Sequence, residues 1–432
     1  MPSTLSTPAE PASLTRAERL RLWTAIRVGD VAALASRLAG RGSGASIRGQ
    51  VLTRLDPNAF ADLLQGHRVL AVSGTNGKTT TTHLLAAAVR SGLGADARRL
   101  VTNADGANLH YGIASALSQQ PRSDIAVLET DERVVSDMIA HARPELLVLL
   151  NFSRDQLDRH HEIKALGRSW RAALAAAGPV GPTIVANACD PLVVWSAGTA
   201  AKVVWVETDT TWSADGALCP ACGTVLRRVP IDERARWDCP GCELTQPEAS
   251  YRVDGERIVL PNGRMVHPDL QVPGSFNVSN AACALAAAVE FGVPVPEALA
   301  GMHTVTAPAG RFATTHFGRT RARLLLAKNP AGWAEALPLA TSDPVILAID
   351  SVAADGKDVS WLWDVEYEQL AGRRVVCTGP RAQDLAVRLS YAGVEHEVEP
   401  DLRAALGERD MPVDVIATYT PFQRLLKMAG LR

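Results

Sequence analysis

The sequence lacks any apolar run long enough to cross a bilayer. Its apolar clusters, such as residues 146–150, are much shorter than the roughly 20 residues that a membrane-spanning helix needs. Residues 1–13 are polar and proline-rich, and they contain no apolar signal-peptide core. These absences favour a cytoplasmic protein.

A dominant charge of either sign is also missing. The 44 basic and 46 acidic residues almost cancel, so no overall field attracts nucleic acid or anionic lipid. We therefore expect no nucleic-acid partner. An arginine-bearing helix expected over residues 13–38 is a local exception with two interpretations: it lies on a membrane surface, or it packs on the next domain.

Cysteines that would form disulfides are scarce. Three of the seven cysteines, Cys189, Cys283 and Cys377, are scattered along the chain, which is typical of a reducing compartment. The remaining four have the spacing C-x₂-C-x₁₆-C-x₂-C, and they are Cys219, Cys222, Cys239 and Cys242. Four thiolates on two tight turns suit tetrahedral Zn²⁺.

The segment that carries these four cysteines, about residues 215–245, has too few apolar residues to fold alone. We predict an inserted structural zinc ribbon, because no open ligand position and no nearby His or Glu completes a hydrolytic site. A nucleic-acid-binding ribbon is one alternative, since the insertion carries several arginines, but it offers little aromatic surface. Redox chemistry is the other alternative.

The length and rhythm of the chain predict an α/β protein with several domains. A chain of 432 residues exceeds one ordinary core. From residue 69 onward, apolar strand-like runs alternate with Ala- and Leu-rich helical runs, which is typical of a parallel sheet flanked by helices. We predict an N-terminal tail and helix at residues 1–44, a nucleotide-binding domain at 45–313 and a smaller α/β domain at 314–432.

A glycine-containing turn joins an apolar strand, residues 69–73, to a helix. The turn and helix start consist of Gly74, Thr75, Asn76, Gly77, Lys78, Thr79 and Thr80. Backbone N–H groups of such a turn converge on phosphate oxygens, the lysine reaches the β- and γ-phosphates, and the hydroxyl of Thr79 ligates Mg²⁺. Val72 stands where the usual spacing has a glycine, so this is a shortened variant. We predict that it binds ATP.

This shortened loop resembles the ATP loop of the Mur ligase and folylpolyglutamate synthetase superfamily. Further stretches resemble that superfamily in the same order, namely residues 127–132, 151–160, 274–281 and 310–311. The resemblance implies a Mur-ligase-like central domain in which Glu129 binds Mg²⁺. It also implies nucleotide contacts by Asn277, Asn280 and Arg311.

Two residues depart from the amino-acid-adding ligases of this superfamily. Gln156 stands where they have a metal-binding histidine, and Arg171 stands near the position of their carbamylated lysine. Because an arginine cannot carry a carbamate, a second metal site is in doubt. Only about 68 residues precede the loop strand, too few for their UDP-sugar-binding domain. A Mur or folylpolyglutamate-type ligase that joins an amino acid to a carboxylate is the alternative function.

The C-terminal region gives a narrower resemblance. Residues 350–364 resemble a signature of MurT-type chains, the synthase subunits of lipid II isoglutaminyl synthases, and these chains also carry a four-cysteine ribbon. The resemblance implies that an aspartate of this domain completes the Cys-His pair of a partner glutaminase. We favour Asp355, followed by Asp358 and then Asp350.

The reaction that this resemblance implies is amidation of the α-carboxyl of D-isoglutamate in the lipid II peptide stem, through an acyl phosphate, to give D-isoglutamine. It implies ATP, Mg²⁺ and a structural Zn²⁺, with Lys78 and Mg²⁺ neutralising the transferred phosphoryl group. The sequence has no Gly-x-Cys-x-Gly nucleophile turn. Ammonia is therefore expected from a GatD-like glutaminase in a heterodimer, working on lipid II at the inner membrane surface.

Overall fold

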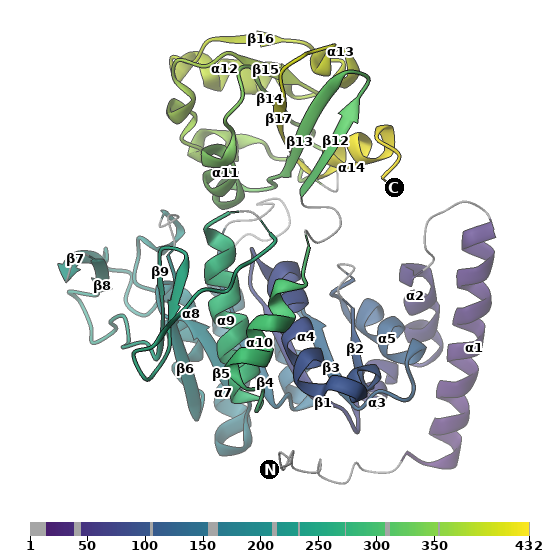
Figure 1. The fold of residues 1–432 in the computed structure, drawn as a ribbon. Helices are drawn as coiled ribbons and strands as arrows, with labels where there is room; N and C mark the ends of the chain where they lie inside the picture. Colours follow the sequence, from purple (N-terminus) through teal and green to yellow (C-terminus); the bar gives the residue numbers. More distant parts are fainter. Residues whose placement is uncertain are drawn as a thin grey trace.

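The computed structural model describes residues 14–38, 45–103, 107–153, 163–209, 214–231, 234–272, 274–306, 312–352 and 355–431. Within these ranges the chain forms a nine-stranded sheet, a six-stranded sheet and a separate two-stranded sheet. Figure 1 shows the six-stranded sheet and its helices stacked on the larger part of the molecule.

The helices described before the large sheet are α1 (Arg16–Leu38), α2 (Ala45–Leu55) and α3 (Ala59–Leu64). α1 lies along α2, and the small residue Gly29 lets the two helices approach closely, because a Cβ there would lie 3.1 Å from the Arg48 carbonyl oxygen. Arg21 also pairs with the fully buried Asp56 at 2.9 Å. The predicted helix therefore packs on its neighbours, while its outer face is exposed along one edge of the molecule (Figure 1).

The large sheet has the strand order β11-β10-β9-β6-β5-β4-β1-β3-β2. Strands β1 to β6 run parallel, as the alternating pattern predicted, and β9 to β11 extend the sheet at one edge. The bounds are β1 (Arg68–Ser73), β2 (Leu100–Thr102), β3 (Ile125–Glu129), β4 (Leu146–Leu149), β5 (Thr183–Asn187), β6 (Lys202–Glu207), β9 (Tyr251–Asp254), β10 (Arg257–Val259) and β11 (Met265–Val266).

Helices cover both faces of this sheet. One face packs against the apolar sides of α4 (Lys78–Leu93), the alanine-rich α9 (Phe276–Glu290) and α10 (Val295–His303). The other face is covered by α5 (His110–Gln119), α6 (Val135–Asp137), α7 (Ile163–Ala177) and α8 (Pro191–Ala197). The helix after β1 and the helix after β4 thus lie on opposite faces, which leaves a crevice at the carboxyl ends of these two adjacent strands.

The cysteine-bearing insertion forms the two-stranded sheet, β7 (Arg227–Ile231) and β8 (Arg234–Asp238). Trp237 anchors this unit, because its buried indole N–H donates to the Ala188 carbonyl at 3.1 Å, at the end of β5. The insertion is therefore attached to the large sheet by packing and a hydrogen bond as well as by the chain.

The smaller sheet has the order β12-β13-β17-β14-β15-β16. Its strands are β12 (Phe312–Phe317), β13 (Thr320–Leu326), β14 (Val345–Ala348), β15 (Val375–Thr378), β16 (His396–Val398) and β17 (Val413–Ala417), all parallel except the β12–β13 hairpin. Its α-helices, as far as the structure describes them, are α11 (Pro330–Ala336), α12 (Ala382–Tyr391), α13 (Leu402–Leu406) and α14 (Tyr419–Met428). The sequence predicted β13, β14, β15 and β17, but not the edge strands β12 and β16.

Across the ranges listed above, none of the helices combines the length and the apolar character needed to span a bilayer.

Candidate nucleotide-binding site

The loop between β1 and α4 lies at the crevice of the large sheet, and two of its residues have backbone angles that favour glycine. Gly74 has φ of 141° and Gly77 has φ of 84°. A Cβ on Gly74 would lie 2.9 Å from the backbone nitrogen of Asn151, and a Cβ on Gly77 would overlap the side chain of Asn280. Both glycines are therefore required by the backbone and by close neighbours.

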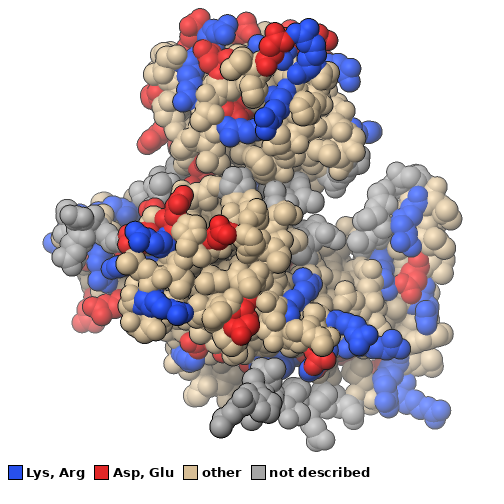
Figure 2. All heavy atoms as spheres, in the orientation of Figure 1, with Lys and Arg blue, Asp and Glu red and all other residues tan. Residues whose placement is uncertain are grey.

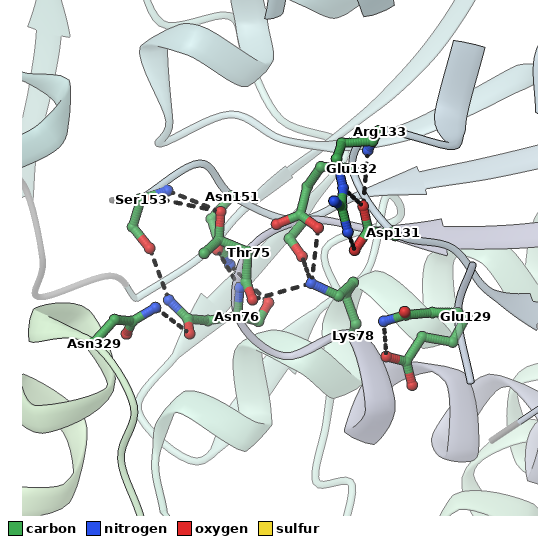
Figure 3. A network of polar contacts seen from close by, with 12 residues as sticks. Thr75, Asn76, Lys78, Glu129, Asp131, Glu132, Arg133, Asn151, Ser153 and Asn329 are labelled. Atoms are coloured by element: carbon green, nitrogen blue, oxygen red, sulfur yellow. Dashed lines mark hydrogen bonds and ion pairs between the residues drawn. The ribbon is translucent and has the colours of Figure 1, made fainter. Parts of the chain in front are cut away.

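The segment after β4 holds this loop in shape (Figure 3). The N–H of Thr75 donates to the Asn151 carbonyl and the N–H of Asn76 to the Asn151 side-chain oxygen, both at 2.9 Å. The Asn76 amide donates to the Ser153 hydroxyl at 2.9 Å, and the Ser153 N–H donates to the Thr75 hydroxyl at 3.1 Å. Because these bonds form within the protein, the loop is preorganised for a ligand.

Lys78, the first residue of α4, is almost fully buried, with 7% of its side chain exposed. Its ammonium group donates to the carbonyls of Gly74 and Thr75 and pairs with the Glu132 carboxylate at 3.1 Å. Gly77 precedes it at the helix start and has no side chain to cap the first turn. A cation and a helix N-terminus thus meet at one point, which suits a phosphate group.

Glu129 ends β3, the strand next to β1, and only 2% of it is exposed. Asn103 exchanges two hydrogen bonds with its backbone, both at 2.8 Å, and the Asn108 amide donates to Oε1 at 2.9 Å. The other carboxylate oxygen, Oε2, is buried and has no hydrogen-bond partner among the described residues. Since an unpaired buried carboxylate oxygen is costly, this one fits a hard cation such as Mg²⁺.

The other loop residues and the start of α9 complete this side of the site. The side chains of Thr79 and Thr80 are buried in the first turn of α4. Asn280 contacts the loop at Gly77, and its amide donates to the Asn277 side-chain oxygen at 2.9 Å. The structure thus brings both predicted asparagines to the loop. Arg311 and Gln156 lie outside the described residues.

A buried aspartate, Asp190, holds the segment that follows β4 at the crevice. Asp190 starts α8 and accepts hydrogen bonds from the backbone N–H groups of Phe152, Leu192 and Val193. Burial raises the pKa of Asp190 to about 6, although these three N–H groups favour its charged form. The local sequence marks Asp190, followed by proline, only as a helix start, because its contact with Phe152 depends on tertiary structure.

Asn329 of the smaller domain contacts the loop region. Its side-chain oxygen caps α11 by accepting the Gly332 N–H at 2.9 Å, and its amide donates to the Asn76 side-chain oxygen at 3.2 Å (Figure 3). Asn329 is 1% exposed. It therefore links the phosphate loop to the fold of the C-terminal sheet.

The acidic loop after β14 lies at a similar crevice of the smaller sheet, next to the start of α14. One oxygen of Asp355 accepts the Thr420 N–H at 2.7 Å, and its other oxygen, Oδ2, is buried without a hydrogen-bond partner among the described residues. Asp350 is buried and lies 3.5 Å from the guanidinium group of Arg424, which lines a cavity of about 600 Å³. Asp358 is exposed, and the Ser360 N–H donates to it and lowers its pKa.

The four predicted metal ligands meet in the insertion. The sulfur atoms of Cys219, Cys222, Cys239 and Cys242 all lie within 4.8 Å of one another, with closest separations of 3.4 and 3.6 Å. Tetrahedral thiolate coordination of zinc separates the sulfurs by about 3.8 Å, from Zn–S bonds of about 2.3 Å. These residues therefore fit a Zn²⁺ ion.

Arg171, by contrast, has a structural contact away from the loop. Its guanidinium group donates to the Trp195 carbonyl and lies 5.2 Å from the centre of that indole ring. The residue thus joins α7 to α8. This packing role agrees with the expectation that Arg171 does not act as a carbamylated lysine would.

Comparison with known proteins identifies two matching family models. The Mur ligase middle domain matches residues 72–215, and the MurT ligase C-terminal domain matches residues 326–422. The MurT subunit of lipid II isoglutaminyl synthase (glutamine-hydrolyzing) from Staphylococcus aureus strain N315 is 30% identical over 398 residues, covering 87% of this chain and 89% of that protein. The same subunit from Streptococcus pneumoniae is 28% identical, covering 90% of this chain and 93% of that protein.

Solved structures agree on the fold. A pseudomurein peptide ligase type C from Methanothermus fervidus superposes with a TM-score of 0.64 at 17% identity, covering 84% of this chain and 79% of that one. MurF from Acinetobacter baumannii superposes with a TM-score of 0.60 at 15% identity, covering 89% and 80%. The predicted Mur-ligase-like α/β fold with a C-terminal domain is thereby confirmed.

Proposed function

The chain belongs to the MurT family of Mur-type ligases, and from this premise we propose that it is the synthase subunit of a lipid II isoglutaminyl synthase. It amidates the α-carboxyl of D-isoglutamate in the lipid II peptide stem, using ATP and ammonia, and gives D-isoglutamine. The observation that carries the proposal is the preorganised loop at Gly74 to Thr80, with the Lys78 ammonium group at one side. We assign ATP binding to residues 45–313, with Asn277, Asn280 and Arg311 as further nucleotide contacts.

The chemistry follows from the weak reactivity of a carboxylate. A carboxylate oxygen of the substrate attacks the γ-phosphorus of ATP, ADP leaves, and an acyl phosphate forms. Ammonia then attacks the carbonyl carbon, and inorganic phosphate leaves with the former carboxylate oxygen. Lys78 and the N–H groups at the start of α4 stabilise the negative charge that develops on the transferred group.

The proposed function includes two metal sites, one for Mg²⁺ and one for Zn²⁺. Glu129 and Thr79 would hold Mg²⁺, and the Oε2 of Glu129, which has no partner among the residues that the structure describes, supports that role. When bound there, Mg²⁺ supplies charge neutralisation to the phosphate groups. The four clustered cysteines would hold a structural Zn²⁺, which stabilises the insertion.

The source of ammonia is a separate glutaminase subunit of the GatD type. Hydrolysis of glutamine by this class of enzyme uses an activated thiolate, and burial raises the pKa of Cys189 to about 11 and the pKa values of Cys283 and Cys377 to about 12. These three thiols are therefore poor nucleophiles. The relatives' printed name, a subunit of a glutamine-hydrolyzing synthase, supports the same division of labour.

We propose that residues 314–432 contact this partner. The acidic loop after β14 would supply the aspartate that completes the partner's Cys-His pair. Asp355 is the first choice, because the Thr420 N–H orients one oxygen and the other has no partner among the described residues. Such a carboxylate can orient a histidine. Asp358 is the second choice, since it is exposed and within reach of another protein. Asp350, held near Arg424, is the third. Because lipid II is a membrane lipid, we expect the heterodimer to work at the inner face of the membrane.

The proposal is tested by comparing ammonium and glutamine as nitrogen donors. The purified chain alone, with ATP and lipid II, should amidate with ammonium but not with glutamine, and adding the glutaminase should restore the use of glutamine. In that complex, Asp355→Asn should abolish the glutamine-dependent rate and leave the ammonium-dependent rate intact. Amidation from glutamine by the chain alone would overturn the proposal, whereas loss of the glutamine-dependent rate in Asp358→Asn only would move the assignment to that residue.

A further inference from the structure

The long helix α1 has two apolar faces on opposite sides. The inner face, which includes Leu22, Ala25 and Ala33, is buried against its neighbours. The outer face carries large apolar side chains at successive spacings of three, eight, three and four residues, so they line one side of the helix. Their exposed fractions all exceed one half: Leu20 65%, Trp23 56%, Val31 67%, Leu34 51% and Leu38 82%. A stripe of this length on one helix is unusual for a surface that faces only water.

Basic side chains border and interrupt the stripe. α1 contains five arginines and two acidic residues, of which Asp30 is already paired with Arg48 at 2.6 Å. Arg27 lies within the stripe, with its guanidinium group 5.5 Å from the centre of the Trp23 ring. Figure 2 shows mostly basic side chains among the tan surface along this edge of the molecule. The face thus combines apolar area, tryptophan and positive charge, which is the composition of helices that lie in the membrane interface.

We propose that the outer face of α1 docks the enzyme on an anionic lipid surface, with the helix lying in the plane of the headgroups. This inference rests on the proposed function, because a lipid-linked substrate brings the enzyme to a membrane. The stripe from Leu20 to Leu38 extends about 27 Å at 1.5 Å per residue. Its apolar side chains enter the boundary between headgroups and acyl chains, and its arginines contact lipid phosphates.

A second copy of the chain is the rival occupant of this face. Pairing two such stripes would bury the Arg27 guanidinium group in an apolar seam, and the net charge of both helices is positive. Arg27 has one distant carboxylate partner, Asp30 at 3.9 Å, and burial of such a loosely paired charge is costly, whereas a layer of anionic headgroups supplies further negative charge. The charge pattern therefore favours the lipid surface.

The test uses the full chain and extruded vesicles that contain no lipid II. One set is phosphatidylcholine alone, and the other is an equal mixture with phosphatidylglycerol. The wild type should sediment with the mixed vesicles, and less with the neutral ones, and the binding should weaken as salt is raised. The double variant Val31→Glu, Leu34→Glu should lose this binding. The matched control Val180→Glu, Val387→Glu adds the same charges at exposed valines elsewhere and should bind as the wild type.

The contribution of charge is tested with a triple variant, Arg16→Gln, Arg19→Gln, Arg37→Gln. Each arginine near an anionic surface contributes roughly a fivefold increase in partitioning, so the triple variant should bind on the order of 100-fold more weakly. Its control, Arg252→Gln, Arg257→Gln, Arg264→Gln, changes the net charge equally at exposed positions of β9, β10 and the turn that follows.

Equal vesicle binding by wild type and the Val31→Glu, Leu34→Glu variant would overturn the proposal. So would the absence of vesicle binding together with a concentration-dependent dimer, seen by sedimentation velocity, that this variant abolishes. Ammonium-dependent amidation of detergent-solubilised lipid II is measured in parallel. Because that assay needs no membrane, it should be unchanged in the variant, and its failure in the wild type would count against the proposed function instead.

Discussion

Replacing Gly77 with alanine adds one methyl group at the tightest point of the phosphate loop. The residue has φ of 84°, where an L-residue is strained by about 1–2 kcal/mol. The new Cβ would also overlap the side-chain oxygen of Asn280, which has to retreat by roughly 1 Å to reach ordinary contact distance. Asn280 is hydrogen-bonded to Asn277, so the backbone of the loop is expected to shift instead.

The two effects are separated by a control, Gly263→Ala. Gly263 has φ of 78°, and a Cβ there would meet nothing within 4 Å. Both variants should lose stability through backbone strain, at about 2–4 °C in Tm for each kcal/mol. Only Gly77→Ala moves the groups that bind phosphate, and a displacement of about 1 Å can cost on the order of 100-fold in rate.

The assay is the ammonium-dependent amidation rate at varied ATP concentration, together with thermal unfolding. We expect kcat/KM for ATP to fall about 100-fold in Gly77→Ala and to change little in Gly263→Ala. The reasoning is refuted if the two variants have the same kcat/KM, because the contact with Asn280 would then have no functional consequence.

Three further changes test other parts of the site. Glu129→Gln removes the charge of the carboxylate whose Oε2 has no hydrogen-bond partner among the described residues, so the Mg²⁺ concentration for half-maximal activity should rise at least about tenfold. The control Glu256→Gln changes a carboxylate that is 86% exposed and should leave this concentration unchanged. Cys219→Ser should lower the zinc content by about one equivalent, while Cys283→Ser should not, and an unchanged content in Cys219→Ser would refute the ribbon. The raised pKa of Asp190, about 6, means that the folded state holds its proton more tightly than the unfolded state does. The wild-type free energy of unfolding, measured relative to Asp190→Asn, should therefore fall by at most about 1.4 kcal/mol per pH unit from about pH 4 to pH 6 and stay level above pH 7. A difference that is the same at pH 5 and pH 7 would contradict this.

The phosphate loop could be predicted from the sequence because its residues are contiguous. A strand, two glycines, a lysine and a threonine define the loop locally, and the structure has β1 and α4 at the expected residues. The position of Glu129 could also be predicted, since a carboxylate at the end of a strand beside β1 lies at the same edge of the sheet as the loop.

The residues that support the site could not be predicted in the same way. Asn103 and Asn108 form hydrogen bonds with Glu129, from which they are separated by 26 and 21 residues in the sequence. Asn329 donates a hydrogen bond to Asn76, which is 253 residues away in the sequence. Nothing in their local sequence indicates these partners, although Asn329 followed by proline is a typical helix start. The edge strands β12 and β16 were missed because short, half-exposed strands carry a weak apolar pattern.

The rank of the three aspartates also depends on tertiary structure. Sequence spacing puts Asp350, Asp355 and Asp358 in one loop, but their burial and partners differ because α14 begins beside this loop and only Asp355 accepts its Thr420 N–H. The hydrogen bond from Thr420 supports the proposed preference for Asp355, and the local sequence does not indicate it.

The central claim is that this chain activates a carboxylate by phosphorylation, and the fate of one oxygen atom tests it most directly. Lipid II labelled with ¹⁸O in the α-carboxyl of D-isoglutamate is amidated with ATP and ammonium, and the inorganic phosphate is analysed by mass spectrometry. The account predicts one ¹⁸O atom in phosphate for each amide formed from a fully labelled carboxylate. Amide formation with unlabelled phosphate would contradict it.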